Sequence, residues 1–527
     1  MRLTRECPIC SKNLVLISST KLSTTELFKT FKCGHCFIET VEAPIDRSEL
    51  IFDSVYKTKT ARDYQKDGIE FILNSNFCCT LADQMRLGKT PQALLALANK
   101  YNERKKVLIT VRSANEAQWI REYKKWVDPL PLGIYPIRGS KGWIPPGFHT
   151  YIISMDTLGR KGMLDKLKEM KFDLIIADEA HSFKNGDSQR SQAITDLLKA
   201  LNEVDDSNGT LTTKKPCGIV LLTGTPIKNR ADEMFVPLNL TNPEGVPSLD
   251  HYRKRWLTQD DKGKWSRVNP YKIDEFKEFI SPVFLRREKE DVYTDLPPLN
   301  RMYTVITIED EALKKAYNKI LDKMDQDLSE GHTSYWEQQD NLMMLRQICG
   351  LAKVDWLADY LEISMDEDPT KKYAIGIHHH SVRDLLQLKL KKYGVKTLSG
   401  SDSAESKDHI MTTFEKSWER VLVINMLAGG VGMDFHYLND ILILERQWSS
   451  ADEEQFEFRF YNPDKSIKSC STDVEYVLAK GTVDEYFHDM IENKRQICGE
   501  TIGTQWDLTT DPAMFKELIE RTVGSRL

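Results

Sequence analysis

Short runs of apolar residues alternate with longer amphipathic stretches from about residue 51 onward. In the first part of the chain the apolar runs are 107–111, 151–154, 172–177 and 219–222, and a further run precedes Gly88. Continuous apolar, β-branched runs of this length are typical of strands buried on both faces of a parallel sheet, and the amphipathic stretches between them predict helices. The pattern therefore predicts a parallel α/β domain over residues 49–244.

A second series of apolar runs, at 373–377, 421–424, 441–444 and 474–478, predicts another α/β lobe over residues 371–500. The intervening residues 245–370 are rich in charged and aromatic side chains, show few strand-like runs and contain helical patterns such as 312–317. We interpret 245–370 as a helical insertion that joins the two lobes, and residues 501–527 as a C-terminal helical tail. The predicted fold class is α/β, with two tandem parallel-sheet lobes.

The turn Gly88-Lys89-Thr90 stands between one of these apolar runs and a helix predicted at 91–97. A glycine turn at a helix start leaves backbone N–H groups free to bind phosphate. Lys89 would then reach the β- and γ-phosphates of a nucleotide, and the Thr90 hydroxyl would bind Mg²⁺.

Asp178 and Glu179 directly follow the apolar run 172–177, within the sequence Asp178-Glu179-Ala180-His181. They lie at the carboxyl end of a predicted strand, where parallel sheets bind their ligands. Asp178 suits metal binding, and Glu179 suits orienting or deprotonating an attacking water. A phosphate loop followed by such a carboxylate pair predicts a site that hydrolyses a nucleoside triphosphate.

Two cysteine pairs occur near the start of the chain, Cys7-x-x-Cys10 and Cys33-x-x-Cys36, with 22 residues between them. Two such pairs can converge into the tetrahedral Cys₄ shell of a zinc site, whereas the alternative is four incidental thiols. The spacing predicts a zinc-ribbon-like segment over residues 1–48. So small a segment would depend on its metal to fold.

Bulk composition narrows the class of protein. A chain of 527 residues is too long for one core, and its formal charge of −6 argues against a uniformly basic coat while leaving local nucleic-acid binding open. No apolar stretch is long enough to span a bilayer, and the N-terminus lacks the apolar core of a secretory signal. The protein is therefore expected in a reducing, intracellular setting, where its ten cysteines are metal ligands or buried thiols. Compact lobes without histone-reading additions favour a bacterium or a virus-infected cell.

The second lobe should complete a nucleotide site that is built on the first. Residues 222–229, Leu-Thr-Gly-Thr-Pro-Ile-Lys-Asn, end a predicted strand and could relay the nucleotide state towards the cleft. In Gln455-x-x-x-Arg459 the arginine could supply a cation to the γ-phosphate, as an arginine finger does. The alternative for Arg459 is a solvated helix residue.

These motifs, taken in order, resemble the superfamily 2 helicase-type motors, specifically the SWI/SNF-like branch of double-stranded DNA translocases, over residues 60–500. The matching segments are 62–68, 81–92, Asp178-Glu179-Ala180-His181 with 184–185, 222–229, 284–292 with 296–298, 345–349, 398–401, 428–432, 455–459 and 480–485. The resemblance implies two RecA-like lobes and ATP as the nucleotide. His378-His379-His380 resembles the fork-remodelling, annealing-helicase subgroup, although a polar strand end would look the same.

The resemblance also implies roles for individual residues. Gln65 would contact adenine, Gly88, Lys89 and Thr90 would hold the phosphates and Mg²⁺, and Arg459 would act as the finger. Residues in motifs that line the DNA backbone track are Ser154, Thr225, Ser399 and Gly429, to which Arg112 could add a phosphate contact. Such contacts give movement along double-stranded or branched DNA without base specificity. The zinc segment would contact DNA or a protein partner.

Three positions depart from the family pattern. Arg86 stands where the family has glycine, Asn462 where it has a second finger arginine, and Arg112 where it favours proline. The first two leave open a catalytically weakened ATP-binding clamp on DNA as an alternative to a motor. An RNA-dependent superfamily 2 helicase is a further alternative, against which the segments 284–292 and 296–298 resemble the duplex-DNA branch.

Overall fold

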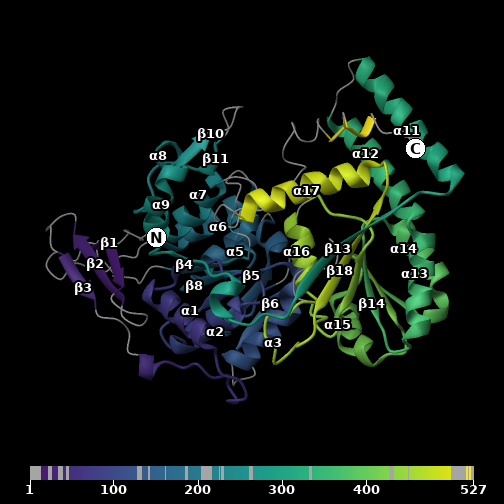
Figure 1. Cartoon of the computed structure of the whole chain (residues 1–527). Coiled ribbons are helices and arrows are strands. Elements are labelled where there is room, and N and C mark those ends of the chain that lie inside the picture. The colour runs from purple at the N-terminus through teal and green to yellow at the C-terminus, as the bar shows by residue number, and fades with distance from the viewer. Residues whose placement is uncertain are drawn as a thin grey trace. The chain divides into compact units, whose positions relative to one another are not determined.

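The chain, described here by a computed structural model, divides into two compact units, Met1–Val292 and Tyr293–Leu527 (Figure 1). The residues that the structure describes are 14–21, 27–33, 39–42, 47–127, 133–139, 143–160, 162–183, 188–202, 217–224, 226, 231–259, 265–330, 335–426, 433–448, 450–499, 518–519 and 521–523.

The first unit is built around a seven-stranded parallel sheet with the strand order β12-β4-β9-β8-β5-β7-β6. The strands are β4 (Cys78–Leu81), β5 (Val107–Val111), β6 (Ile134–Ile137), β7 (Thr150–Ser154), β8 (Leu174–Ala177), β9 (Gly218–Leu222) and β12 (Phe284–Leu285). Every residue of β4, β5, β7, β8 and β9 is buried. Because all these strands run parallel, the segments that follow β4, β5, β8 and β9 emerge at one edge of the sheet.

Helices cover both faces of this sheet. One face packs against α1 (Asp63–Asn74), α2 (Lys89–Asn99) and α3 (Glu116–Trp126). The other packs against α4 (Met155–Leu158), α5 (Met163–Glu169), α6 (Gln189–Asn202) and α7 (Phe235–Thr241). This unit also contains α8 (Leu249–Trp256), β10 (Leu257–Gln259), β11 (Trp265–Val268), α9 (Ile273–Ile280) and α10 (Lys289–Val292). The result is the doubly covered sheet that the apolar runs predict.

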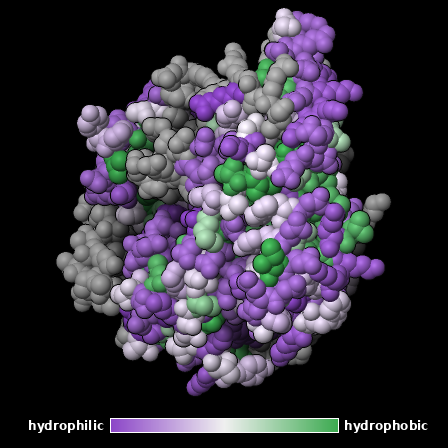
Figure 2. Space-filling model, turned by 45° about the vertical axis from the view of Figure 1, so that its right-hand side comes forward, coloured by the Kyte–Doolittle hydropathy of each residue, from purple (hydrophilic) through white to green (hydrophobic). Residues whose placement is uncertain are grey.

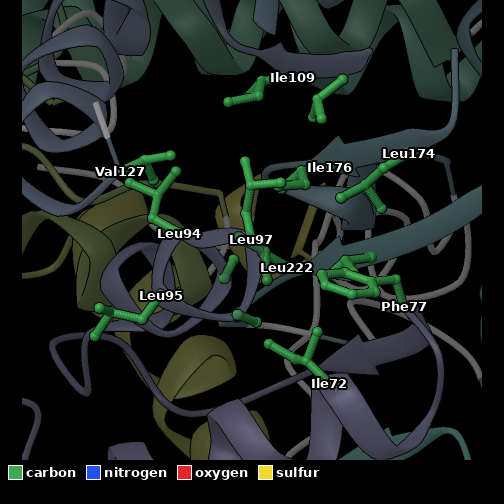
Figure 3. Close-up of a cluster of buried hydrophobic side chains, with 14 of the residues drawn as sticks. Ile72, Phe77, Leu94, Leu95, Leu97, Ile109, Val127, Leu174, Ile176 and Leu222 are labelled. Atoms are coloured by element: carbon green, nitrogen blue, oxygen red, sulfur yellow. The ribbon is translucent and has the colours of Figure 1, made fainter. Parts of the chain in front are cut away.

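The core on the α2 face fixes the helix that begins at the phosphate loop. Leu94 and Leu97 of α2 are fully buried in one cluster with Ile109, Ile176 and Leu222 of three central strands (Figure 3). Burying an aliphatic side chain of this size contributes about 1.5–3 kcal/mol. The N-terminus of α2 is therefore held firmly against the carboxyl edge of the sheet.

The second unit contains a six-stranded parallel sheet with the order β13-β18-β17-β14-β16-β15. Its strands are β13 (Leu299–Ile306), β14 (Tyr373–Ile377), β15 (Val395–Leu398), β16 (Val421–Asn425), β17 (Asp440–Ile443) and β18 (Thr472–Ala479). One face packs against α13 (Val354–Glu367) and α14 (His380–Lys389), and the other against α15 (Ala404–Thr413) and α16 (Ser450–Glu457). A separate cluster joins α11 (Glu311–Ser329), α12 (Tyr335–Ala352) and α17 (Val483–Gly499).

A small antiparallel sheet lies near the N-terminus, formed by β1 (Leu14–Lys21), β2 (Leu27–Cys33) and β3 (Glu39–Glu42). Leu14 pairs with Cys33, so the start of β1 and the end of β2 lie side by side. The predicted zinc ligands Cys7, Cys10 and Cys36 lie outside the described residues, as does the side chain of Cys33.

The predicted interior strands of both sheets are confirmed, since the runs at 107–111 and 373–377 match β5 and β14 residue for residue. The structure differs from the predicted helical segment 245–370, which also contains β10, β11, β12 and β13. In the structure β12 joins the sheet of the first unit and β13 joins that of the second. Their sequences hide them, because β12 has two residues and the first seven residues of β13 are exposed or half-buried.

Hydrophilic residues predominate on the face of the protein in Figure 2, and hydrophobic residues form separate patches among them. Among the helices of the described residues, none combines the length and the apolar character needed to cross a membrane.

Candidate functional site

The phosphate loop joins β4 to α2 and turns sharply just before the helix. The Leu87 N–H donates to the Gln84 carbonyl at 3.3 Å, and Gly88 has a φ of 73°, a left-handed conformation that glycine adopts without strain. Lys89 Nζ donates to the carbonyls of Asp83 and Gln84 at 2.7 and 3.3 Å. Burial lowers the pKa of Lys89, and the nearby carboxylates of Asp83, Glu179 and Asp178 oppose this shift.

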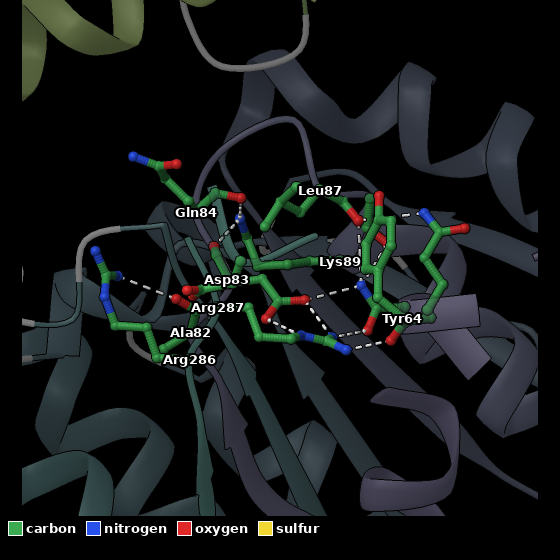
Figure 4. A network of polar contacts seen from close by, with 12 residues as sticks. Tyr64, Ala82, Asp83, Gln84, Leu87, Lys89, Arg286 and Arg287 are labelled. Carbon is green, nitrogen blue, oxygen red and sulfur yellow. Dashed lines mark hydrogen bonds and ion pairs between the residues drawn. The ribbon is translucent and has the colours of Figure 1, made fainter. Parts of the chain in front are cut away.

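An ion pair between the partly exposed Arg287 and the buried Asp83 holds this loop in place (Figure 4). Arg287 Nε and Nη2 donate to the two carboxylate oxygens of Asp83 at 2.9 and 2.6 Å, and Asp83 has no exposed surface. Leu285 of β12 pairs with Leu81 of β4, which brings Arg287 to the loop. Loss of one partner of a buried pair costs about 3–5 kcal/mol, because the other charge stays buried.

Gln92 of α2 extends the same network. Its Nε2 donates to Asp83 Oδ2 at 3.0 Å and to the carbonyls of Leu87 and Gly88, each at 3.2 Å. Its Oε1 accepts from Arg287 Nη2 at 2.8 Å. A Cβ atom at Gly68 would lie 1.8 Å from Gln92 Oε1, so only glycine leaves room for this amide.

Gln65 and its neighbour tie the start of α1 to the phosphate loop. Gln65 Nε2 donates to the Leu87 carbonyl at 3.2 Å, and its Oε1 accepts from the Arg62 N–H at 3.0 Å. The Arg287 guanidinium lies 5.4 Å from the Tyr64 ring and donates to the Tyr64 carbonyl. Both ends of the Gln65 amide therefore help to hold the start of α1 against the phosphate loop.

Asp178 follows β8 at the same edge of the sheet. Its Oδ2 accepts from Trp119 Nε1 at 2.8 Å and from Asn115 Nδ2 at 3.4 Å, and its Oδ1 accepts from the Glu179 N–H at 3.0 Å. Burial, followed by the charge of Glu179, raises the pKa of Asp178 to about 6. The hydrogen bonds orient the carboxylate, and a cation at this site would favour its ionised form.

Glu179 is held by a different set of groups. Its backbone has a φ of 51°, which is uncommon outside glycine, and its Oε2 lies 3.1 Å from His181 Nδ1. The His181 Nε2 lies 2.9 Å from Arg112 Nη2. Burial alone would raise the pKa of Glu179, but the hydrogen bond from His181 and the charges of Arg112 and Lys89 lower it.

The segment after β9 reaches the phosphate loop from its other side. A Cβ atom at Gly224 would lie 2.7 Å from Met85 Cγ and 3.6 Å from Lys89 Nζ, so the glycine permits close approach. Arg286 Nη1 donates to the carbonyls of Ala82 and Gly224 at 3.1 and 3.3 Å, which links the two segments. The predicted DNA-track residue Thr225 lies outside the described residues.

Other predicted residues of the first unit have structural contacts of their own. Thr90 is the second residue of α2 and is half-buried. Ser154 ends β7 and caps α4, where its Oγ accepts from the Thr157 N–H at 3.2 Å. Trp119 and Trp126 are buried on α3.

In the second unit, Arg459 follows α16 and is 6 % exposed, with its guanidinium 5.9 Å from the Phe456 ring. The alternative of a solvated helix residue is therefore wrong. Asn462 Oδ1 accepts from the Asp464 N–H at 3.0 Å in the turn that follows. The Ser399 N–H donates to Asp402 Oδ2 at 2.6 Å, and Gly429 lies outside the described residues.

The histidine motif at the end of β14 is anchored by a buried carboxylate. Glu445 Oε2 accepts from the backbone N–H groups of His378 and His379 at 2.7 and 2.9 Å, and Glu445 Oε1 lies 2.5 Å from His379 Nδ1. Burial lowers the pKa of His378 to about 4. These contacts give the motif a structural role within the second unit.

Sequence reasoning missed several residues that support the site, namely Asp83, Gln92, Asn115, Trp119 as a donor to Asp178, and Arg287. They act through tertiary contacts, which a strand or helix pattern does not reveal. Asp83 and Gln92 lie in the matching segment 81–92 and Arg287 lies in 284–292, and this is the sequence signal that pointed towards these three residues.

The residues present suit a nucleotide with Mg²⁺. The helix start at Gly88, the ammonium of Lys89 and the hydroxyl of Thr90 are donors and ligands for phosphate and metal. Asp178 adds a carboxylate that is already oriented by Trp119.

Comparison with known proteins places this site in a family. A model of the SNF2-related domain matches residues 64–353, which include the phosphate loop, both carboxylates and Arg287. The chain belongs to the SNF2-related family. The family expected from the ordered motifs is thereby confirmed.

This SNF2-related chain is similar to several larger proteins. It is 25 % identical over 455 residues to the DNA annealing helicase and endonuclease ZRANB3 of Bos taurus, covering 84 % of this chain and 40 % of that protein. It is 25 % identical over 443 residues to the SWI/SNF-related matrix-associated actin-dependent regulator of chromatin subfamily A-like protein 1 of Xenopus laevis, covering 83 % and 43 %. The SNF2-related chain spans less than half the length of these relatives.

Among solved structures, the SNF2-related chain is similar to the Sulfolobus solfataricus SWI2/SNF2 ATPase core in complex with dsDNA. The identity is 20 %, the TM-score is 0.40, and the match covers 89 % of this chain and 98 % of that one.

Proposed function

We propose that this chain is an ATP-driven motor that moves along double-stranded or branched DNA and remodels DNA structures or protein–DNA complexes. The observation that carries the proposal is the meeting of Lys89, Asp178 and Glu179 at one edge of the first sheet, where their charges interact. Membership of the SNF2-related family and the similarity to a protein named a DNA annealing helicase support DNA as the partner.

Each candidate site residue of the first unit has a defined role in this proposal. Gln65 contacts the adenine, and Gly88 and Lys89 bind the phosphates. Thr90 and Asp178 hold Mg²⁺, which when bound neutralises charge on the phosphates. Glu179 orients the attacking water and accepts its proton. Trp119 holds the Asp178 carboxylate in a fixed orientation, because its N–H donates to Oδ2 at 2.8 Å.

Arg459 of the second unit is the proposed finger that stabilises the charge of the transition state. Since the nucleotide would then be held by residues of both units, hydrolysis and release would change their separation. Such alternation is a physical basis for stepping along a polymer.

The DNA track is proposed to include Arg112, Ser154, Thr225, Ser399 and Gly429. Contacts there would go mainly to backbone phosphates, which carry no sequence information. Binding should therefore weaken steeply as salt rises, because phosphate contacts release counterions.

The proposal is tested by measuring ATP turnover of the full chain with duplex DNA, forked DNA, single-stranded DNA, RNA or no nucleic acid. Duplex or forked DNA is expected to stimulate turnover well above the basal rate, and RNA is not. Turnover that no nucleic acid changes would favour a nucleotide-binding clamp, and stimulation by RNA alone would favour an RNA-dependent helicase.

We also propose that Cys7, Cys10, Cys33 and Cys36 bind Zn²⁺. The pairing of Leu14 with Cys33 supports this, because the first cysteine pair precedes β1 and the second begins at the end of β2, at the same end of the hairpin. Elemental analysis of the purified chain is expected to find about one zinc per chain, and Cys7→Ser with Cys33→Ser to remove it. A metal-free wild-type protein with normal folding would contradict this.

A further inference from the structure

A continuous chain of polar contacts runs from the surface of the first unit to Glu179. Arg112 is half-buried at the end of β5, and its Nη2 lies 2.9 Å from Nε2 of the buried His181. The other ring nitrogen of His181, Nδ1, lies 3.1 Å from Glu179 Oε2. One imidazole therefore connects a partly exposed cation to the carboxylate that is proposed to orient water.

The chemistry of arginine shows which group donates and which accepts in each of these contacts. A guanidinium can only donate hydrogen bonds, so Nε2 of His181 accepts from Arg112. The proton of the neutral imidazole is then on Nδ1, which donates to Glu179 Oε2. Arg112 thus sets the tautomer and the orientation of His181. Through His181 it occupies one of the oxygens of Glu179.

The sheet explains why these residues meet. Strands β5 and β8 are parallel neighbours in which Thr110 pairs with Ala177, and the Asp178 N–H donates to the Thr110 carbonyl at 2.9 Å. Arg112 and Glu179 therefore leave adjacent strands at the same level. The segment that follows Arg112 also supplies Asn115 and Trp119, whose side chains donate hydrogen bonds to the Asp178 carboxylate.

We propose that Arg112 is a positioning residue that couples a DNA backbone phosphate to Glu179. In the protein without DNA, Arg112 donates to His181, and His181 keeps Glu179 engaged. A phosphate of the duplex captures Arg112, His181 loses the donor that fixes it, and Glu179 is released to orient water. This inference rests on the proposed function, since it concerns how DNA would stimulate the same site.

Replacing the hydrogen bond from Arg112 to His181 by a contact from Arg112 to a DNA phosphate is favourable. A hydrogen bond between a guanidinium and a phosphate is charged on both sides and can be bidentate, whereas Nε2 of a neutral imidazole offers one uncharged acceptor. A carboxylate oxygen that already accepts from His181 is in turn a weaker acceptor for a proton of water. Contact with DNA therefore both breaks the restraint and improves the base.

Two substitutions of Arg112 separate this role from a purely structural one. Arg112→Ala removes the donor to His181, so basal turnover without DNA is expected to rise about 5-fold or more, and the stimulation by duplex DNA to fall by the same factor. Arg112→Gln keeps an amide donor for His181 but carries no charge to attract phosphate. Its stimulation by duplex DNA is expected to fall as in Arg112→Ala, while its basal rate rises less than that of Arg112→Ala.

The experiment compares basal and duplex-stimulated ATP turnover of wild type, Arg112→Ala, Arg112→Gln and the control Arg190→Ala. Arg190 is an arginine of the same unit, half-exposed and paired with Asp156 at 2.6 Å, and its loss should change neither rate. Thermal unfolding of each variant shows whether it is folded. The salt dependence of duplex binding by Arg112→Ala is expected to lose about one unit of slope, as for one phosphate contact.

The experiment distinguishes failure of the coupling through Arg112 from failure of the proposed function. If duplex DNA stimulates the wild type and Arg112→Ala to the same extent, the coupling through Arg112 is overturned while the proposed function stands. Equal loss of basal rate in both Arg112 variants would also overturn it, because that pattern indicates a structural role. If the wild type itself does not respond to DNA, the proposed function fails and the inference fails with it.

Discussion

Arg459→Ala is expected to lower the DNA-stimulated kcat by about 10³–10⁵-fold, the range associated with loss of an arginine finger. The physical reason is that no other side chain of the matching motif supplies a second cation, since Asn462 stands where the family has arginine. The Asn462 amide is used locally, accepting from the Asp464 N–H. ATP binding, measured with a fluorescent analogue, should change far less than kcat.

Burial of Arg459 requires controls for folding. The side chain is 6 % exposed and lies by Phe456, so alanine could loosen α16. Arg459→Lys keeps the charge and most of the volume, and it should fold normally yet recover only part of the rate, because lysine cannot form the planar fork. Arg383→Ala, which removes a half-buried arginine paired with Asp384, should leave turnover unchanged. A folded Arg459→Ala with near wild-type kcat would exclude the finger role.

Glu179→Gln is expected to reduce turnover by about 10²–10⁴-fold, the usual contribution of a general base. Glutamine has nearly the same shape and can still accept from His181 Nδ1, so binding of ATP and DNA should persist. Lys89→Ala should instead weaken nucleotide binding, because it removes the ammonium between the loop carbonyls of Asp83 and Gln84.

The two variants are compared in parallel assays of nucleotide affinity and single-turnover hydrolysis. Glu169→Gln, an exposed glutamate at the end of α5, serves as the matched control and should behave as wild type. Normal hydrolysis by Glu179→Gln would remove Glu179 from the chemistry and leave it a structural partner of His181.

The strands that the sequence predicts and those it hides differ in their place in the sheet. Interior strands such as β5 and β14 are covered on both faces and flanked on both sides, so every residue is buried and the run is apolar throughout. The strands at the sheet edges are β6, β12, β13 and β15, none of which the apolar runs revealed. An edge strand such as β13 tolerates Asn300 and Arg301, which breaks the apolar pattern.

The residues of the candidate site also fall into those that the sequence predicts and those that it does not. Lys89, Asp178 and Glu179 could be predicted because each follows an interior strand within a short motif. Trp119 reaches Asp178 from 59 residues away and looks in sequence like an ordinary core residue of α3. Arg287 reaches Asp83 from 204 residues away. Their partners depend on the sheet order, which the sequence alone does not provide.

The pairing of Arg287 with Asp83 has a consequence for how the protein is made. At about 5–20 residues per second, a ribosome needs roughly 10–40 s to add the 204 residues between them. Throughout that time the growing first unit carries an aspartate without its countercharge and a sheet without its last strand, β12. The nucleotide-binding loop should therefore be among the last parts of this unit to reach its native structure during synthesis. Nascent chains released before residue 284 should be especially dependent on chaperones.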